Sequence, residues 1–374
     1  MNTRKHTFRP LIWGRILFLS ALLPLGCTSE LPPHADFDTA AQIIPSPLRE
    51  IRILTINVWS GLTYEGFFKI GQYPDDSERR FGLLLKEIRK IQPDVIAIQE
   101  ANPLPSYAQV LAKNLNYQVI YRVALGGIRF GSFGIPTNLR EGEVILVRKP
   151  WSIVDLGRKH LGGNGIATNW FCFHFGDITQ VILGQAEIGG KRLYIYAVHL
   201  HSGPFRGSAL DNAVNRMAQE MPRERIEEAR KDVERTIKRR GQEIATLKAF
   251  IDATLPSGMP AILLGDFNTT VESGELDSLL NDGKWVDSYR IKNPKGEGAT
   301  WDPFRNPNFR QAEVSTRASE ILHTYHKEYP SRIDFIFVGS NIPRESILES
   351  RIVLTPENGF CASDHYGVLT ALKW

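Results

Sequence analysis

The sequence predicts an α/β or α+β sandwich in which two β-sheets stack face to face. Apolar runs of strand length are numerous, helical patterns between them are few, and at two places one strand follows another directly. A purely parallel doubly wound sheet would carry a helix between successive strands, so stacked sheets explain the pattern better. The strand-length runs are residues 51–59, 94–98, 143–147, 181–188, 193–199, 261–264, 333–338 and 367–372.

Two segments predict amphipathic helices. Residues 79–91 place leucine and isoleucine on one face, and Gln92-Pro93 ends the helix. Residues 222–255 form the longest candidate, with apolar positions at spacings of three, four and seven. The charged stretch at about 206–240, which covers the first half of that helix, predicts a helical insertion. Its charged face is either solvated and rich in ion pairs or a contact for nucleic acid or phosphoinositide.

The first 27 residues are typical of an export signal. Basic residues precede an apolar stretch at 16–25, which is short for a membrane span, and Cys27 follows a glycine at its end. Cys27 resembles the lipidated cysteine of bacterial lipoproteins; a plain cleaved secretory signal and an uncleaved membrane anchor are the alternatives. Residues 28–48, rich in proline, predict a tether to a domain at 49–374. We therefore expect an exported protein, either a cell-envelope lipoprotein held to the membrane by its lipid or a secreted protein.

Charge and cysteine content restrict the function further. The formal net charge is +4, but the N-terminal 26 residues hold four basic residues and no acidic one, so the rest is neutral. A neutral domain argues against a dedicated duplex-DNA binder, because such proteins usually carry a basic stripe. Beyond Cys27, Cys172 and Cys361 lack a zinc-site spacing. We expect them to be buried as small apolar residues, with a disulfide between them as the alternative.

Polar side chains lie at the ends of several predicted strands. They are Asn57, Gln99-Glu100, His199, Asp266-Phe267-Asn268, Asp334 and, before the last strand, Ser363-Asp364-His365. The carboxyl ends of buried strands converge on one rim, the usual place for a site. Taken singly, these residues could cap a helix or fill a turn. Asp334 is more informative, because an acid inside an apolar run is expected to be buried and to need a partner such as histidine or arginine.

In this order, these residues resemble the endonuclease/exonuclease/phosphatase superfamily, whose members have the deoxyribonuclease-I-like fold. The resemblance covers residues 49–374. It implies a four-layered α/β sandwich, with two packed sheets flanked by helices, and magnesium-dependent cleavage of phosphoester bonds. Mg²⁺ prefers oxygen ligands and is held by one or two carboxylates, and Mn²⁺ is the alternative ion. No grouping of histidine and cysteine has the spacing of a zinc site.

The resemblance also implies a role for each matching residue. It assigns Asn57, Glu100 and Asp364 to the metal ion, and His199, Asp266, Asn268, Asp334 and His365 to catalysis. Asp334 would orient His365, which would act as the base on water or, if protonated, as the clamp on phosphate. His199 would donate a proton to the leaving group. Asp266 and Asn268 would position water and phosphate.

Four further residues near these motifs have two interpretations each. Trp301, in a loop, either walls the substrate cleft or belongs to the core. Arg332 and Arg305 either bind substrate phosphate or are solvated at the surface. His201 follows His199 by two residues, and its side chain points to the same side as that of His199 only if the strand continues past His199.

The expected substrate is a phosphoester: a phospholipid head group, a nucleic acid or a small phosphate ester. An extracellular nuclease and a sphingomyelinase-like lipid phosphodiesterase are the specific alternatives, since loops set the substrate in this superfamily. Residues 126–136 fit a membrane-inserting segment, a mobile lid or a buried loop. A non-catalytic binding protein on the same fold would show loss of the metal and histidine positions, which are intact. No obligate protein partner is evident from the sequence.

Overall fold

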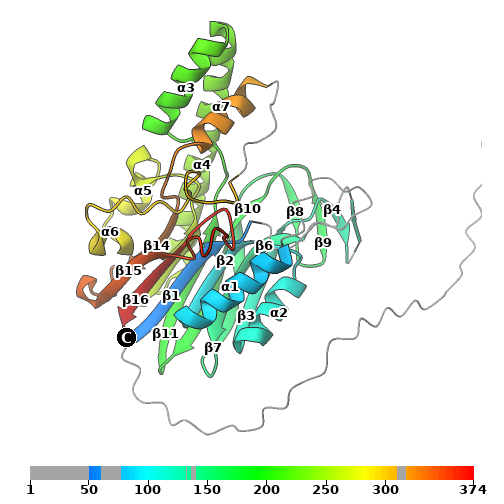
Figure 1. Cartoon of the computed structure of the whole chain (residues 1–374). Coiled ribbons are helices and arrows are strands. Elements are labelled where there is room, and N and C mark those ends of the chain that lie inside the picture. Colours follow the sequence, from blue (N-terminus) through cyan, green and yellow to red (C-terminus); the bar gives the residue numbers. More distant parts are fainter. Residues whose placement is uncertain (1–49, 60–76, 132, 136–139, 310–316) are drawn as a thin grey trace, which may run out of the picture. The chain divides into compact units, whose positions relative to one another are not determined.

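Two mixed β-sheets lie face to face in the computed structural model, which describes residues 50–59, 77–131, 133–135, 140–309 and 317–374 (Figure 1). Within these residues, the first sheet has the order β15-β16-β1-β2-β6-β3, with bounds β1 (Glu50–Asn57), β2 (Val95–Ala101), β3 (Tyr117–Leu125), β6 (Glu141–Arg148), β15 (Ile347–Val353) and β16 (Gly367–Lys373). The second sheet has the order β13-β14-β12-β11-β10-β7, with bounds β7 (Ser152–Gly162), β10 (Thr179–Ile188), β11 (Lys191–His199), β12 (Ala261–Asp266), β13 (Trp285–Asp287) and β14 (Asp334–Gly339).

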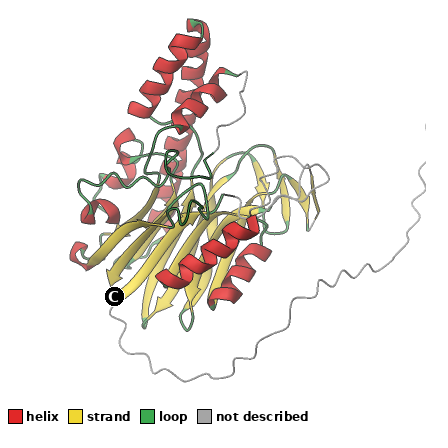
Figure 2. Cartoon of the chain, viewed as in Figure 1, coloured by secondary structure: helices red, strands yellow, loops and turns green. Residues whose placement is uncertain are grey.

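Helices cover the outer faces of both sheets (Figure 2). The first sheet packs against α1 (Ser77–Ile91) and α2 (Ser106–Leu115), and the second against α4 (Arg223–Thr254) and α5 (Asp277–Leu280). The other helical segments are α3 (Ser208–Glu220), α6 (Ser288–Lys292), α7 (Ala318–Lys327) and the 3-10 turns η1 (Val271–Ser273) and η2 (Arg344–Ser346). The order helix, sheet, sheet, helix is the four-layered α/β sandwich that the resemblance implied.

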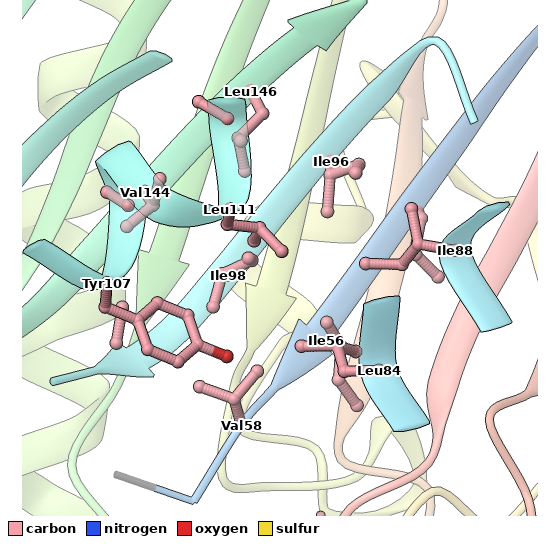
Figure 3. Close-up of a cluster of buried hydrophobic side chains, with 14 of the residues drawn as sticks. Ile56, Val58, Leu84, Ile88, Ile96, Ile98, Tyr107, Leu111, Val144 and Leu146 are labelled. Atoms are coloured by element: carbon pink, nitrogen blue, oxygen red, sulfur yellow. The ribbon is translucent and has the colours of Figure 1, made fainter. Parts of the chain in front are cut away.

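Apolar side chains fill the spaces between these layers. Ile53, Ile145 and Ile262 belong to the cluster between the two sheets. On the outer face of the first sheet, Ile56 meets Leu84 of α1 (Figure 3). Fully burying one such side chain contributes about 1.5–3 kcal/mol. Strand β1 is therefore held from both faces, which explains its nearly continuous apolar sequence and fixes the position of its last residue.

Two extensions flank the sandwich (Figure 1). One is a small sheet of order β5-β4-β9-β8, with bounds β4 (Ile128–Phe130), β5 (Phe133–Ile135), β8 (Gly165–Ala167) and β9 (Phe171–His174). The other, here called the helical extension, consists of α3, α7 and the first half of α4, which share an apolar cluster of their own. The charged insertion predicted at 206–240 falls on α3 and this half of α4. Ion pairs such as Arg223 with Glu227 and Arg206 with Glu234 line its exposed surface.

The predicted strand runs all coincide with strands, and the two predicted helices coincide with α1 and α4. The sequence did not identify β3, β7, β13, β15 or the small sheet. Cys172 and Cys361 are both free and buried, so the structure shows the expected burial and not the alternative disulfide. Residues 126–136 include β4 and β5, and Ser132 and Pro136 lie outside the described residues.

The predicted signal segment, Cys27 and the tether lie outside the described residues. Among the residues that are described, no helix combines the length and the apolar composition that a membrane crossing requires. The described residues belong to one compact unit, Ser46–Trp374, and every apolar cluster is made of residues from this unit. We therefore expect the unit Ser46–Trp374 to fold on its own.

Gly265 allows two neighbouring strands to approach closely just before the end of β12. Its φ is +140°, and a Cβ atom built on it would lie 1.9 Å from the carbonyl oxygen of Val198 on β11. A side chain would therefore have to push apart the backbones of a parallel strand pair. Because His199 and Asp266 follow these two residues, the glycine sets the spacing between them.

Gly265→Ala is expected to lower the free energy of unfolding by at least about 2 kcal/mol, since the new methyl group meets backbone and the φ is unfavourable. Gly82→Ala is the matched control, because it lies in α1 with nothing within 4 Å of the added Cβ. That control is expected to raise stability by about 0.5–1 kcal/mol. Urea denaturation measures both, and equal midpoints for the two variants would contradict the close approach.

Candidate active site

Strand register places three of the expected site residues side by side on the second sheet. His199 at the end of β11 lies opposite Asp266 at the end of β12, and Asp266 lies opposite Asp334 at the start of β14. On the first sheet, Asn57 ends β1 beside Gln99 of β2. The pairs β11–β12 and β1–β2 are parallel, so the strands of each pair end at the same edge. Packing of the two sheets then brings both edges together.

Asp266 connects the two sheets. Its carboxylate is 1% exposed and accepts hydrogen bonds from Asn57 Nδ2 at 3.0 Å and from the backbone N–H of Asn268 at 2.8 Å. The same Asn57 amide donates to Glu100 Oε1 at 2.9 Å. Burial, together with the charge of Asp334, raises the pKa of Asp266 to about 6, although two nearby histidines oppose this. Asp266 is thus a desolvated acid that titrates close to neutral pH.

His365 and Asp334 form a buried hydrogen-bonded pair. His365 Nδ1 lies 2.9 Å from Asp334 Oδ2, and the backbone N–H groups of Ile333 and Asp334 both donate to Thr300 Oγ1 at 3.1 Å. Burial lowers the pKa of His365, but the charge and hydrogen bond of Asp334, with the charge of Asp266, raise it more, to about 10. The imidazole is therefore a cation at neutral pH, with Nε2 3.9 Å from Asp266 Oδ2.

His199 has a second carboxylate partner, Glu143 of β6. His199 Nδ1 lies 4.0 Å from Glu143 Oε1, while its Nε2 lies 3.7 Å from Asp266 Oδ2 and 3.9 Å from Glu100 Oε1. Burial lowers the pKa of His199, but the charges of Asp266, Glu100 and Glu143 outweigh it and the net shift is upward. Two histidines, each with a second carboxylate beside it, therefore approach the same oxygen of Asp266, Oδ2.

Glu143 was not among the residues expected from the sequence. Burial raises its pKa to about 7, and Gln180 Nε2 donates to its carboxylate. Arg158 in turn donates to Gln180 Oε1 at 3.0 Å. The signal that could have found Glu143 is the one that pointed to Asp334, an acid adjoining an apolar run of strand length.

A cavity of about 350 Å³ opens at this end of the sandwich. The expected site residues that line it are Glu100, His199, Asp266, Asn268, Trp301, Asp364 and His365. Asn57 and Asp334 are almost fully buried and hold the lining residues by hydrogen bonds from behind. The structure thus brings together every residue that the resemblance assigned to metal or catalysis.

Trp301 forms a wall of this cavity. Its ring lies edge-on to the His365 ring with centroids 5.3 Å apart, and its indole N–H donates to the Lys327 carbonyl at 2.7 Å. Of the two interpretations of Trp301, the position fits the cleft wall. Lys327 at the end of α7 also lines the cavity, and its ammonium lies 5.5 Å from the Trp301 ring. The sequence analysis did not single out this lysine.

Arg332 does not lie in the cavity, contrary to the expectation of a phosphate contact. Its guanidinium bonds Asp287 at 2.6 Å and lies over the rings of Tyr289 and Phe335. The next residue, Ile333, lines the cavity, and successive side chains of an extended chain point to opposite sides. Arg305 is also outside the cavity and exposed.

His201 likewise lies outside the cavity. Its Nδ1 is 2.6 Å from Asp177 Oδ2, and Arg239 bonds the same carboxylate. Strand β11 ends at His199, so the side chain of His201 is not carried into the site by the strand alternation. His201 instead ties the loop after β11 to α4.

The donor set around Glu100 fits a hard divalent cation. Glu100 and Asp364 both line the cavity, and burial, with the charge of Glu100, contributes to raising the pKa of Asp364 to about 6. Carboxylate oxygens are the ligands that Mg²⁺ and Mn²⁺ prefer. A second group, Asp266, Asp334 and His365, also brings possible ligand atoms within 4.8 Å of one another, so a metal ion could be held there as well.

Comparison with known proteins defines the family. A model of the Endonuclease/Exonuclease/phosphatase family matches residues 54–365, most of the chain. The chain belongs to this family. Its members are typically metal-dependent phosphoester hydrolases. A search of the curated proteins finds no match.

Several solved structures share the fold. The endonuclease/exonuclease/phosphatase of Bacteroides vulgatus is 18% identical, with a TM-score of 0.54 and coverage of 87% of this chain and 98% of that one. The family protein of Leptotrichia buccalis is 18% identical, with a TM-score of 0.51 and coverage of 87% and 100%. TDP2 of D. rerio, solved with a single-strand DNA product, is 18% identical, with a TM-score of 0.51 and coverage of 87% and 99%. At these identities the similarity establishes the fold.

The pairing of His365 with Asp334 predicts a pKa change that NMR can measure. In the wild type, the imidazole is expected to stay protonated until its pKa of about 10. In Asp334→Asn, the pKa of His365 should fall well below 10, because burial still opposes the charged form and only Asp266 and Asp364 continue to favour it. Because the pKa of His365 is higher in the folded than in the unfolded protein, protonated His365 stabilises the fold. This contribution is complete below the unfolded pKa of about 6.5 and disappears as pH rises through 10. The difference in free energy of unfolding between wild type and Asp334→Asn should therefore become smaller as pH rises from 6 to 10.

His326 provides the internal reference for this titration. Burial lowers its pKa to about 3, so its ring stays neutral throughout the range. Its imidazole resonances should be the same in wild type and Asp334→Asn. A His365 pKa that does not respond to the substitution would show that Asp334 is not its electrostatic partner.

Proposed function

We propose that this protein is a Mg²⁺-dependent phosphodiesterase. The observation that supports it is that His199 and His365 both approach Asp266 Oδ2, each with a further carboxylate partner, in a cavity that also holds Glu100. Phosphodiester hydrolysis needs an in-line water, neutralisation of the phosphoryl oxygens and a proton for the leaving oxygen. The cavity offers a group for each of these tasks.

Glu100 and Asp364 would hold the metal ion, with Asn57 fixing the orientation of Glu100. When bound there, Mg²⁺ supplies positive charge to the phosphoryl oxygens. We prefer this position to the group of Asp334 with His365, because those two side chains are hydrogen-bonded to each other and Asp334 is fully buried.

The acid and base tasks follow from the protonation states. His365, with a pKa of about 10, holds its proton at neutral pH and serves as the cationic clamp on phosphate, not as the base. Asp266, with a pKa of about 6, is mostly ionised and can accept a proton from the attacking water. Asn57 and Asn268 fix the orientation of its carboxylate. His199, whose pKa is raised, donates its proton to the leaving oxygen.

We further propose export, with Cys27 as the lipidated residue or with a cleaved secretory signal. The support comes from the basic and apolar pattern of residues 1–27 alone. A globomycin-sensitive mobility shift, absent in Cys27→Ser, would identify lipidation in a bacterial host. Secretion without any such shift would favour the plain signal.

Glu100→Gln is expected to reduce Mg²⁺-dependent hydrolysis of bis(p-nitrophenyl) phosphate at least about 100-fold. The neutral amide keeps the shape but loses the charge that holds the cation. Glu357→Gln is the matched control, because Glu357 pairs with lysines at the surface, away from the cavity. That control should retain full activity, and a chelator should abolish activity in both wild type and control. Equal activity in Glu100→Gln and wild type would refute the proposed metal position.

His199→Ala is expected to affect substrates differently according to their leaving group. A dinucleotide releases an alkoxide that must be protonated, so kcat should fall about 10²–10⁴-fold. A p-nitrophenolate leaves without a proton, so the loss on bis(p-nitrophenyl) phosphate should be much smaller. His365→Ala should reduce both reactions alike, because it contacts phosphate in each. A uniform loss in His199→Ala would show that His199 is not the general acid.

Failure of the wild type to hydrolyse any phosphoester with Mg²⁺ or Mn²⁺ would favour a non-catalytic binding role. Bis-aryl phosphate, mono-aryl phosphate, phospholipid and nucleic acid form the test panel. Hydrolysis of mono-aryl phosphate alone would identify a phosphomonoesterase. Preference among the diesters would separate nuclease from lipid phosphodiesterase.

A further inference from the structure

An exposed apolar face lies on the small sheet. The aromatic face, as we name it, consists of Ile128, Phe130, Ile166, Trp170, Phe173 and Phe175. These side chains are between 39% and 75% exposed, and they make up half of the exposed large apolar side chains in the described residues. Such a concentration is unusual for a surface that only faces water.

Strand pairing explains why Ile128, Ile166 and Phe173 share one side of the small sheet, and the rings of Trp170 and Phe175 contact Phe130 and Phe173, respectively. Ile128 of β4 lies opposite Phe173 of β9, and Phe173 lies opposite Ile166 of β8. Alternate residues point the other way, so Arg129 and Cys172 are buried beneath the sheet. Apolar side chains thus cover one side of three neighbouring strands.

The aromatic face is fixed to the wall of the active-site cavity. His174 Nε2 accepts hydrogen bonds from the N–H groups of Gly126 and Gly127 at 2.9 and 3.0 Å, and its Nδ1 donates to the Gly176 carbonyl at 2.9 Å. These glycines connect β4 and β9 to the segments that contain Ala124 and Ile178, which line the cavity. The side chain of His174 therefore ties the small sheet to the segments that line the cavity.

The face carries no exposed charge. Residues 162–176 contain no Asp, Glu, Lys or Arg, and Arg129, the one such residue in 123–135, is 1% exposed. Single-stranded nucleic acid would require basic side chains along its backbone, so this composition disfavours it. Six half-exposed apolar side chains offer roughly 600 Å², below the ~800 Å² per partner of a standard dimer interface. Tryptophan and phenylalanine are instead typical of surfaces that enter the interface of a lipid bilayer.

We propose that the aromatic face docks on a phospholipid bilayer and presents the cavity to the phosphodiesters of its head groups. This inference rests on the proposed phosphodiesterase function and adds the substrate class, phospholipid. The chain that precedes β1 is compatible with it: residues 28–49 follow the proposed lipidation site and span at most about 75 Å when extended. A bilayer that holds Cys27 therefore lies within reach of the face. Because the face is uncharged, binding depends on apolar insertion and not on anionic lipids.

The test uses two double variants of the unit Ser46–Trp374. The face variant carries Phe130→Glu and Phe175→Glu, and the control carries Phe304→Glu and Leu348→Glu. The control residues are also exposed and apolar but belong to other elements. Sedimentation with phosphatidylcholine vesicles is expected to show wild type and control bound equally at low and high salt. The face variant should bind about 10- to 100-fold more weakly. Hydrolysis of soluble bis(p-nitrophenyl) phosphate should be the same in all three, which verifies folding and site.

Failure of this inference and failure of the proposed function are distinguishable. Absence of vesicle binding by the wild type, or equal binding by the face variant, would overturn the docking surface whatever the hydrolysis shows. A wild-type dimer that the face variant dissociates, or salt-sensitive oligonucleotide binding lost in that variant, would also overturn it. Face-dependent vesicle binding without hydrolysis of any phosphoester would support the surface and refute the catalytic proposal. Face-dependent binding with hydrolysis of the soluble diester alone would exclude phospholipid as the substrate.

Discussion

The burial of Asp266 between the two sheets is the constraint on which the site depends. A carboxylate that is 1% exposed destabilises the fold unless hydrogen bonds and opposite charge compensate its lost hydration. The compensation comes from the first sheet through Asn57, from its own turn through Asn268, and from the two histidines. Each of these partners is positioned by a different element. The sandwich must therefore be fully assembled before Asp266 is satisfied, and the chemistry is a consequence of the packing of the sheets.

Much of this arrangement follows from features that a sequence displays. A buried strand is a run of apolar residues, and the polar residue at its end identifies the edge where it stops, as at Asn57 and Asp266. Glu143 similarly lies near the start of β6, directly before an apolar run, but its role depends on a histidine of the other sheet. The prediction that Arg332 contacts substrate phosphate failed for a local reason. Side-chain alternation turns Arg332 away from the cavity, while Ile333 faces it. Sequence order alone does not decide such orientations.

The parts that the sequence did not predict lack a long periodic pattern. The strands of the small sheet are three or four residues long and lie among glycines, too short for an alternation of apolar and polar residues to be recognised. Strand β7 carries mixed side chains because it is an edge strand with irregular pairing to β10. Both features are defined by neighbours distant in sequence.

A buried arginine joins α4 to the loop that follows His199. Arg240 of α4 is fully buried, bonds Glu275 through two nitrogens and donates to the carbonyls of His201, Gly203 and Pro204. A guanidinium without these partners would leave several buried donors unsatisfied, which is costly. The loop after His199 therefore keeps one conformation as long as α4 is in place. This loop lines the cavity through Ser202 and Gly203, and residues beside the small sheet, Ala124 and Ile178, line it as well. The side chains that a phosphoester would meet are thus held by the packing of the two sheets, while much of the cavity wall belongs to loops that other elements hold in place.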